Sequence, residues 1–159
     1  MSPRRSSVFL EVFALSQAVR HLLLAAMADG PLAPDEYAVY SVVFEEESVT
    51  PTQMGHRLGM PKTTVMERVR VMEERGHVRR VTNPRDGRSY QLVLTASGLA
   101  VHRQSHERFE DTYRAFLGEF GGSERRAAAR LAQIRDAVSA ASDRRRAPSS
   151  RPRRAAPHA

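Results

Sequence analysis

The sequence predicts a mainly α-helical protein with a small β-wing, in which a winged helix–turn–helix is joined to a helical dimerisation subdomain. Two short helical patterns meet across Leu58–Pro61, a spacing typical of a helix–turn–helix. Two strand-like runs follow, separated by a charged turn. Longer apolar helical patterns flank this region on both sides.

Residues Phe9–Ala28 form the first helical pattern, and it is strongly apolar. A signal peptide or a membrane span is the first alternative, but polar residues interrupt the run and no small-residue cleavage site follows cleanly. The apolar side chains cover more than one face, so a single small core cannot hide them all. We therefore expect this helix to pack partly against a second chain. The interrupting residues are Glu11, Ser16, Gln17, Arg20 and His21.

Residues Pro34–Glu47 predict the second helix. Asp35 and Glu36 fall in its first turn, where carboxylates interact favourably with the helix dipole. Its apolar stripe is Tyr37, Tyr40, Val43 and Phe44.

The helix–turn–helix begins at Thr50, which can cap a helix because Pro51 follows it and Gln53 stands three residues later. Leu58–Gly59 ends that helix and Pro61 opens the next. A turn this tight fixes the angle between the two helices and leaves the second free to lie in a major groove.

In that second helix Val65, Val69 and Met72 recur at i, i+4 and i+7, which predicts one buried stripe. Gly76 then ends the helix as a left-handed C′ residue. The other face carries Lys62, Thr63, Thr64, Glu67, Arg68 and Val71.

Residues Val78–Val81 and Tyr90–Leu94 predict the two strands of the wing. In the second strand Tyr90, Leu92 and Leu94 alternate with Gln91 and Val93, the period of a half-buried strand. Between the strands, Gly87 lets the turn bend while Arg88 projects from its tip.

Thr95 caps a long helix that extends to about Phe120, where Gly121–Gly122 breaks it. Ser123 caps a last helix. The stripe of the long helix is Leu99, His102, His106, Phe109, Tyr113, Phe116 and Phe120, a spacing suited to helix–helix packing. The inward residues of the last helix are Leu131, Ile134 and Val138.

The two ends of the chain have no apolar period. Residues 1–7 are short, polar and basic, and we expect them to be flexible. Residues 142–159 are rich in Pro, Ser, Ala and Arg, which predicts a disordered tail.

The 159 residues suffice for one domain with a real core, or for two small subdomains that share helices. The absence of cysteine excludes disulfides, thiolate metal sites and a thiol redox switch. The net charge of +7 is unevenly distributed. Arg57–Arg88 and residues 142–159 are basic, whereas Asp29–Glu47 carries six carboxylates and no base. Positive charge thus lies where a polyanion would bind.

The run LGMPKTTVMERVRVMEERGHVRR, followed by NPRDGRSYQLVLTASG, resembles the MarR family of bacterial transcription regulators. Asp86-Gly87-Arg88 with Leu94-Thr95 matches the family's D-x-R…L-T pattern. The resemblance covers roughly residues 9–141 in helix order and is specific in the wing and the helix before it. Two positions depart from it: Pro61 stands where a hydroxyl cap is frequent, and Arg68 stands where an apolar residue is common.

The resemblance implies a homodimer that binds a palindromic operator in double-stranded DNA, located in the cytoplasm with the nucleoid. We assign residues 8–33 and 96–141 to the dimerisation subdomain and residues 34–95 to the DNA-binding subdomain. In the resembled family the wing arginine reaches the DNA, and the aspartate two residues before it, here Asp86, helps to hold the wing. The DNA-binding candidates are Thr52, Lys62, Thr63, Thr64, Glu67, Arg68, Arg85 and Arg88.

His102 and His106 lie one turn apart on an apolar stripe, and three interpretations apply. They can be partly buried histidines that hydrogen-bond a neighbour. They can line a small-molecule effector pocket, since the resembled family keeps its effector site between the dimer helices and the winged helix. They can also bind zinc, because i, i+4 is a chelating spacing that Asp29, Asp35 or Glu36 could complete. The candidate pocket residues are His21, Tyr37, Tyr40, His102 and His106.

Enzyme chemistry finds no support in the sequence, which has no phosphate-binding glycine loop, cysteine nucleophile or serine–histidine–acid grouping. We expect a sequence-specific transcription repressor that a small molecule releases, with no cofactor and no membrane partner. The alternatives are a non-specific DNA-coating protein and a winged helix that docks only to proteins. A large ratio of specific to non-specific DNA affinity separates the first from both alternatives.

Overall fold

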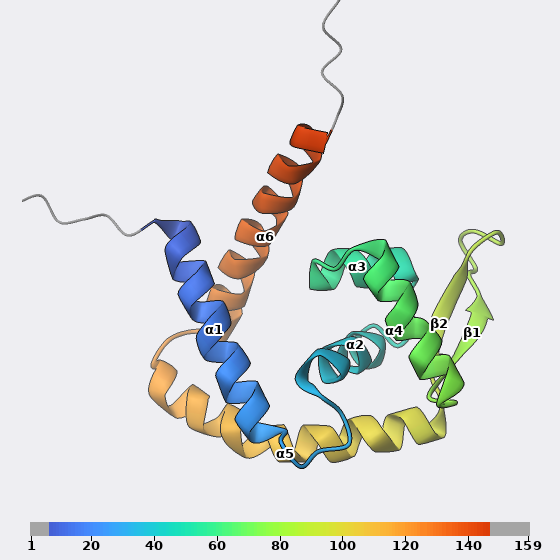
Figure 1. Ribbon diagram of the computed structural model, residues 1–159, viewed down its shortest axis with the longest axis horizontal. Helices are drawn as coiled ribbons and strands as arrows, with labels where there is room; N and C mark the ends of the chain where they lie inside the picture. Colours follow the sequence, from blue (N-terminus) through green and yellow to red (C-terminus); the bar gives the residue numbers. More distant parts are fainter. Residues whose placement is uncertain (1–6, 147–159) are drawn as a thin grey trace, which may run out of the picture. The chain divides into compact units, whose positions relative to one another are not determined.

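The computed structural model describes residues 7–146 of the chain. Within that range the protein is mainly helical with one small antiparallel hairpin, so the predicted fold class is confirmed (Figure 1). In chain order the elements are α1 (Val8–Ala26), α2 (Pro34–Glu45), α3 (Pro51–Leu58), α4 (Lys62–Glu74), β1 (Val78–Thr82), β2 (Tyr90–Leu94), α5 (Ala96–Phe120) and α6 (Glu124–Arg146).

The chain divides after Gly121 into two compact units, residues 1–121 and 122–159. The first unit holds every element from α1 to α5, and the second holds α6. The predicted separation of residues 34–95 from residues 8–33 and 96–141 is a finer division and stays a prediction.

The core of the first unit lies among α2, α3, α4 and β2. The predicted stripe of α4 is confirmed, because Val65, Val69 and Met72 are all buried. The buried apolar residues of this core are Leu32, Val39, Tyr40, Val42, Val43, Val49, Met54, Val65, Val69, Met72, Val78 and Leu92.

The stripe predicted for α2 is wrong at one position. Phe44 is 48% exposed, and the helix buries Val39 and Val42 instead. The reason is that α2 packs on two sides: Tyr40 and Val43 enter the core of the winged helix, whereas Phe44 stacks on His102 of α5.

The ends of α3 and α4 follow the local signals in the sequence. Thr50 and Gln53 form the predicted capping box, and Gly59 ends α3 in the left-handed conformation. Pro61 is the N-cap of α4 and offers no side-chain hydrogen bond. Gly76 ends α4 with a φ of +68°, and the amide of the following His77 donates to the carbonyl of Met72 at 2.9 Å, which is a Schellman motif.

The wing hairpin pairs β1 with β2 antiparallel, with Val78 opposite Leu94 and Thr82 opposite Tyr90. Leu92 points into the core and is fully buried. The backbone of Val49 forms an isolated bridge with Leu92, so β2 is hydrogen-bonded to the segment before α3 as well as to β1.

α5 begins where the wing ends. The Thr95 side chain accepts a hydrogen bond from the amide of Gly98 and donates one to the carbonyl of Gly76 at 2.7 Å. Gly121, with a φ of +61°, ends the helix as predicted. The first turn of α5 is therefore attached to the end of α4 as well as to the wing.

α1 contacts α5 and α2, yet none of its residues is buried. It is long and apolar enough to cross a membrane on length and composition alone. Its side chains cover several faces, as predicted. The strongly exposed apolar residues are Val8, Phe9, Leu10, Phe13, Leu15, Val19, Leu22 and Leu24.

α6 extends to Arg146, so the predicted start of the disordered tail at Ser142 is wrong. Arginine and alanine favour helix, and they continue the α6 segment past the last apolar position. Residues 147–159, and residues 1–6 at the other end, lie outside the described part of the chain.

Candidate nucleic-acid interface

The outer face of α4 lies opposite the buried stripe of Val65, Val69 and Met72. Most of the predicted contact residues of this helix are on the surface there or at its N-terminal end. Lys62, Thr63, Thr64 and Glu67 are all exposed, as is Thr52 in the first turn of α3.

Arg70 belongs to the same outer face, although it is not among the residues predicted from the sequence. Its Nη2 and Nε atoms donate to the two carboxylate oxygens of Glu67 at 2.7 and 3.2 Å. Its Nη1 atom donates to Glu74 on the other side. The signal was present, because Glu67, Arg70 and Glu74 follow the i, i+3 and i, i+4 spacing of helical ion pairs.

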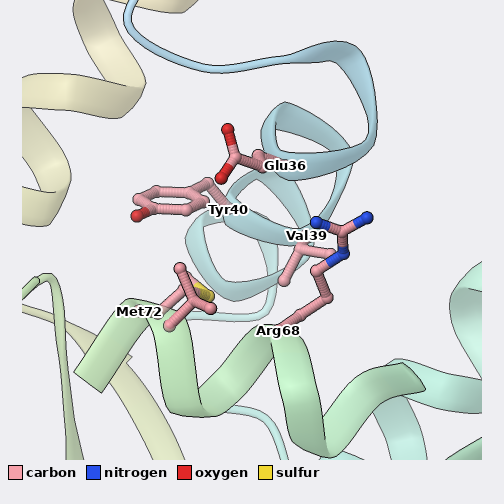
Figure 2. A pocket seen from close by; sticks show the side chains of 6 residues that line it. Glu36, Val39, Tyr40, Arg68 and Met72 are labelled. Carbon is pink, nitrogen blue, oxygen red and sulfur yellow. The ribbon is translucent and has the colours of Figure 1, made fainter. Parts of the chain in front are cut away.

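Arg68 lies instead on the flank of α4 that faces α2. Its Nη2 atom is 3.9 Å from Asp35 Oδ2, at the start of α2. The Arg68 side chain extends along a shallow hollow between the two helices (Figure 2). The hollow is lined by Glu36, Val39, Tyr40, Arg68, Val71 and Met72.

A second ion pair joins the same two helices two turns further along α4. Arg75 Nη1 donates to Glu36 Oε1 at 2.8 Å, and the other carboxylate oxygen of Glu36 accepts from the amide of Ala33 at 3.1 Å. Arg68 and Arg75 therefore both pair with carboxylates of α2, while the outer face of α4 stays open to solvent.

The tip of the wing is held by its own side chains. Asp86 Oδ1 accepts a hydrogen bond from the amide of Arg88 at 3.1 Å, and Asn83 Oδ1 accepts one from the amide of Arg85 at 3.0 Å. The side chains of both arginines are exposed. Gly87 does not adopt a positive φ, and a Cβ added there would meet nothing within 4 Å. The bend therefore does not depend on Gly87, because the Asn83 and Asp86 side chains fix it.

The base of the wing is tied to α4 by Arg80. Its guanidinium donates to both carboxylate oxygens of Glu73 and lies 4.3 Å from the centre of the Tyr90 ring. Tyr90 in turn contacts Met66 of α4 through its hydroxyl. Side chains on both strands of the wing thus contact α4.

The five residues predicted for an effector pocket divide into separate groups. Tyr37 and His106 come together, with the Tyr37 hydroxyl 2.8 Å from His106 Nδ1, and His102 stacks on the Tyr37 ring. Tyr40 faces the winged helix, where its hydroxyl lies 2.7 Å from His77 Nδ1. His21 is exposed on α1 and forms none of these contacts.

Three further residues complete the cluster around His102. Ser41 Oγ lies 3.1 Å from His102 Nε2, the Phe44 ring stacks on His102, and Phe109 contacts Tyr37. His102 is only 3% exposed, and its Nδ1 atom has no hydrogen-bond partner in the structure. The sequence pattern indicated the histidines but not these partners.

The environments of His102 and His77 disfavour the charged forms of these two side chains. Burial, with the neighbouring His106 adding to it, lowers the pKa of His102 below its ordinary value. Burial and the positive charge of Arg75 likewise lower the pKa of His77. Burial raises the pKa values of Tyr37 and Tyr40, so both hydroxyls keep their protons.

The zinc interpretation needs a third ligand near His102 and His106. In the part of the chain that the structure describes, no group of three or more His, Cys, Asp or Glu side chains is placed to hold a metal ion. Asp35 and Glu36 point toward Arg68 and Arg75 of α4 rather than toward the histidines.

Comparison with known proteins connects this geometry to a family. The sequence profile of the MarR family matches residues 39–89, which include α3, α4, β1 and the turn of the wing but not β2. The HTH-type transcriptional regulator TtmR of Methylorubrum extorquens (strain PA1) is 29% identical over 93 residues. That alignment covers 58% of this chain and 48% of TtmR, so the chain spans about half the length of this curated relative.

Solved structures agree with the profile. The PcaV transcriptional regulator from Streptomyces coelicolor, in complex with its natural ligand, is 27% identical with a TM-score of 0.62, covering 89% of this chain and 98% of PcaV. The M. tuberculosis transcriptional regulator MOSR, in complex with DNA, has a TM-score of 0.66 at 20% identity, covering 84% and 98% of the two chains. At that identity MOSR supports the fold alone.

The profile covers the helix–turn–helix and the first strand of the wing, and PcaV extends the likeness to β2 and the flanking helices. The matched profile, TtmR and PcaV are all described as transcription regulators. In the sequence of its helix–turn–helix and in its fold, the chain is similar to the winged helix–turn–helix transcription regulators of the MarR family.

Proposed function

We propose that this protein is a homodimeric transcription repressor that binds a palindromic operator and leaves it when a small molecule binds. The observation that carries the proposal is the arrangement of α4 and the wing. The outer face of α4 and the tip of the wing are both exposed, while the buried side chains of Val65, Val69 and Met72 hold α4 in the core from behind. A fixed helix with an open outer face is what insertion into a major groove requires.

The wing supplies the second contact of the proposed complex. Arg85 and Arg88 project from a tip whose backbone is held by Asn83 and Asp86. Arginine is favoured in a narrow minor groove, because the negative potential is greatest there. The side chains of α4 then read base edges in the adjacent major groove.

Dimerisation is supported by apolar surface that the single chain leaves uncovered. Phe9 and Phe13 of α1 are 68% and 62% exposed. The second half of α5 adds a stacked aromatic row, Phe109, Tyr113, Phe116 and Phe120. α6 carries Leu131, Ile134 and Val138 at helical spacing. Patches of this kind mark protein interfaces, and a two-fold dimer presents two recognition helices to two half-sites.

The relatives favour the same proposal. TtmR is named as a transcriptional regulator, and the PcaV structure contains that protein's natural ligand. We place the effector of this chain at the cluster of Tyr37, His102 and His106, between α2 and α5. The unpartnered Nδ1 atom of buried His102 gives a ligand a polar group to bind. We also propose that the protein acts on chromosomal DNA in the cytoplasm.

DNA selection tests the proposal. The purified chain is incubated with a random duplex pool and with genomic fragments, and bound DNA is sequenced. An inverted repeat bound at least about a thousandfold more tightly than scrambled DNA at physiological salt supports sequence-specific regulation. Equal affinity for all sequences with a steep salt dependence indicates a DNA-coating protein. No DNA binding at all leaves the protein-docking alternative.

The effector part of the proposal has its own test. His102→Ala combined with His106→Ala should keep dimerisation and operator binding but weaken release of the operator by the metabolite that releases the wild type. Coupling between effector and DNA of about 1–3 kcal/mol, typical of allosteric proteins, makes the difference measurable. A double variant that unfolds contradicts this assignment and favours histidines with a purely structural role.

A further inference from the structure

The outer face of α4 carries a carboxylate that is held in one orientation. Arg70 engages both oxygens of Glu67, and Glu74 binds the opposite end of the same guanidinium. All three side chains are more than half exposed. The Glu67–Arg70–Glu74 group, which we name the outer triad, lies on the surface proposed to enter the major groove.

Stability does not account for the outer triad. Exposed ion pairs of this kind contribute little to folding, since water solvates the separated charges well. The other cations of α4 are engaged elsewhere or lie at its end: Arg68 and Arg75 pair with carboxylates of α2, and Lys62 is the first residue of the helix. Arg70 is therefore the cation of α4 that pairs with Glu67.

A carboxylate on a DNA-facing surface has an unfavourable interaction with phosphates unless a cation offsets it. Arg70 supplies that charge and fixes the carboxylate plane by its two-pronged contact. Each carboxylate oxygen accepts two hydrogen bonds, so both oxygens of Glu67 keep an outward lone pair. In the major groove the base donor that suits such an acceptor is the amino group of cytosine.

We propose that Glu67 determines specificity by accepting a hydrogen bond from cytosine N4, and that Arg70 is a positioning residue that holds Glu67 for this contact. Glu74 keeps Arg70 from swinging toward the phosphates. The proposal rests on the proposed function, because it presupposes that α4 enters a major groove. It goes further by naming the base and the side chains that select it.

The experiment compares the purified wild type with Glu67→Gln, Arg70→Lys and the control Glu74→Gln. Glu67→Gln keeps the shape of the side chain and removes its charge. Arg70→Lys keeps the charge and loses the two-pronged contact. Each protein selects from a random duplex pool, and affinities for the best site and its single-base variants are then measured. Melting temperature and sedimentation confirm that every variant is folded and dimeric to the same degree. Glu67→Ala replaces Glu67→Gln if that variant is not.

For the wild type we expect one C:G pair in each half-site whose replacement weakens binding by about 5- to 150-fold, the range for a good base contact. Glu67→Gln should lose that preference. Arg70→Lys should reduce it by at least about threefold, while its affinity for scrambled DNA stays within about twofold of the wild type, because the net charge is unchanged. Glu74→Gln should keep most of the preference for the C:G pair.

Two results overturn the proposal while leaving the proposed function intact. The first is a wild-type site whose base preferences are the same in Glu67→Gln. The second is a C:G preference that Arg70→Lys removes and Glu67→Gln leaves intact, which means that Arg70 leaves the triad and reads the guanine itself. A wild type that selects no sequence overturns the proposed function instead.

Discussion

The carbonyl oxygen of His77 lies 2.0 Å from the position that a Cβ atom would occupy at Gly98. This close approach joins the end of α4 to the first turn of α5, where Thr95 also donates its amide to the same carbonyl at 3.0 Å. A methyl group at Gly98 cannot fit, because the atoms opposite it are backbone and cannot rotate away.

Gly98→Ala should therefore lower the free energy of unfolding by about 1–3 kcal/mol or more, the usual cost of overpacking. Denaturant unfolding followed by circular dichroism measures the change. Gly118→Ala in the same helix is the matched control, since a Cβ there meets nothing within 4 Å. The control should be neutral or stabilising by about 0.5–1 kcal/mol, the helix preference of alanine over glycine.

Stability should depend on pH through His102. Its pKa is lowered in the folded protein by burial and by His106, so the unfolded chain binds the proton more readily. The stabilisation is complete above the unfolded pKa near 6.5 and is lost as pH falls from there toward the lower folded pKa. His102→Phe keeps a ring for the stack with Phe44 and Tyr37 and removes the titration.

Between pH 7 and pH 5, His102→Phe should flatten the slope of unfolding free energy against pH by up to about 1.4 kcal/mol per unit. Denaturant titrations at several pH values give this slope. His56→Gln, at an exposed site on α3, is the control and should leave the slope unchanged. An equal slope in the wild type and His102→Phe would show that other groups carry the acid sensitivity.

Arg88→Ala should weaken operator binding by about 1–3 kcal/mol, the range for a good specific contact. The wing backbone should be unaffected, because Asp86 binds the amide of residue 88 and not its side chain. Fluorescence anisotropy with the selected operator measures the loss. Arg103→Ala removes the same charge from an exposed position on α5 and should have a much smaller effect. Equal losses of operator affinity in both variants would mean that Arg88 contributes only its charge and makes no specific contact.

Local signals were sufficient to predict most of the fold. The Thr50–Gln53 capping box, the Gly76 helix end and the alternation in β2 each depend on residues within a few positions of one another, and all three are confirmed. Contacts that join distant segments were not predictable in this way. The pairing of Asp35 with Arg68 depends on how α2 and α4 pack, which no local spacing records.

In the candidate site, too, local features could be predicted and contacts between distant segments could not. Exposure of Lys62, Thr63 and Thr64 followed from the buried stripe of α4. The orientation of Tyr40 toward His77, away from the α5 histidines, could not be predicted in this way. A helix buried on two sides carries one continuous apolar pattern, which does not show which side each residue faces. Arg70 was within reach of the helical spacing rules, since both of its carboxylate partners lie within four residues of it.

Removing residues 147–159 should leave the fold, the dimer and the preferred DNA sequence unchanged and should lower general DNA affinity. This boundary keeps α6 whole, since the helix ends at Arg146. The segment holds Arg151, Arg153 and Arg154. The slope of log affinity against log salt should become shallower by about 0.9 for each phosphate that these arginines no longer neutralise. Loss of the dimer or of the preferred site on truncation would mean that the segment is structural.

Replacing Phe9 and Phe13 by serine should convert the dimer to monomer at micromolar concentration. Both side chains are among the most exposed apolar groups of α1, and no residue of this helix is buried, so the fold of the single chain does not depend on them. Large aromatic side chains at the centre of an interface often cost more than about 2 kcal/mol when truncated, which is roughly a thirtyfold loss in dimer affinity for each. Sedimentation velocity across a concentration series measures the shift, and circular dichroism checks that the helices persist. Pro84→Ser, on the exposed wing, is the control and should remain dimeric. If the double serine variant stays dimeric, α1 is not part of the interface, and its exposed apolar surface must be covered by something other than a second copy of this chain.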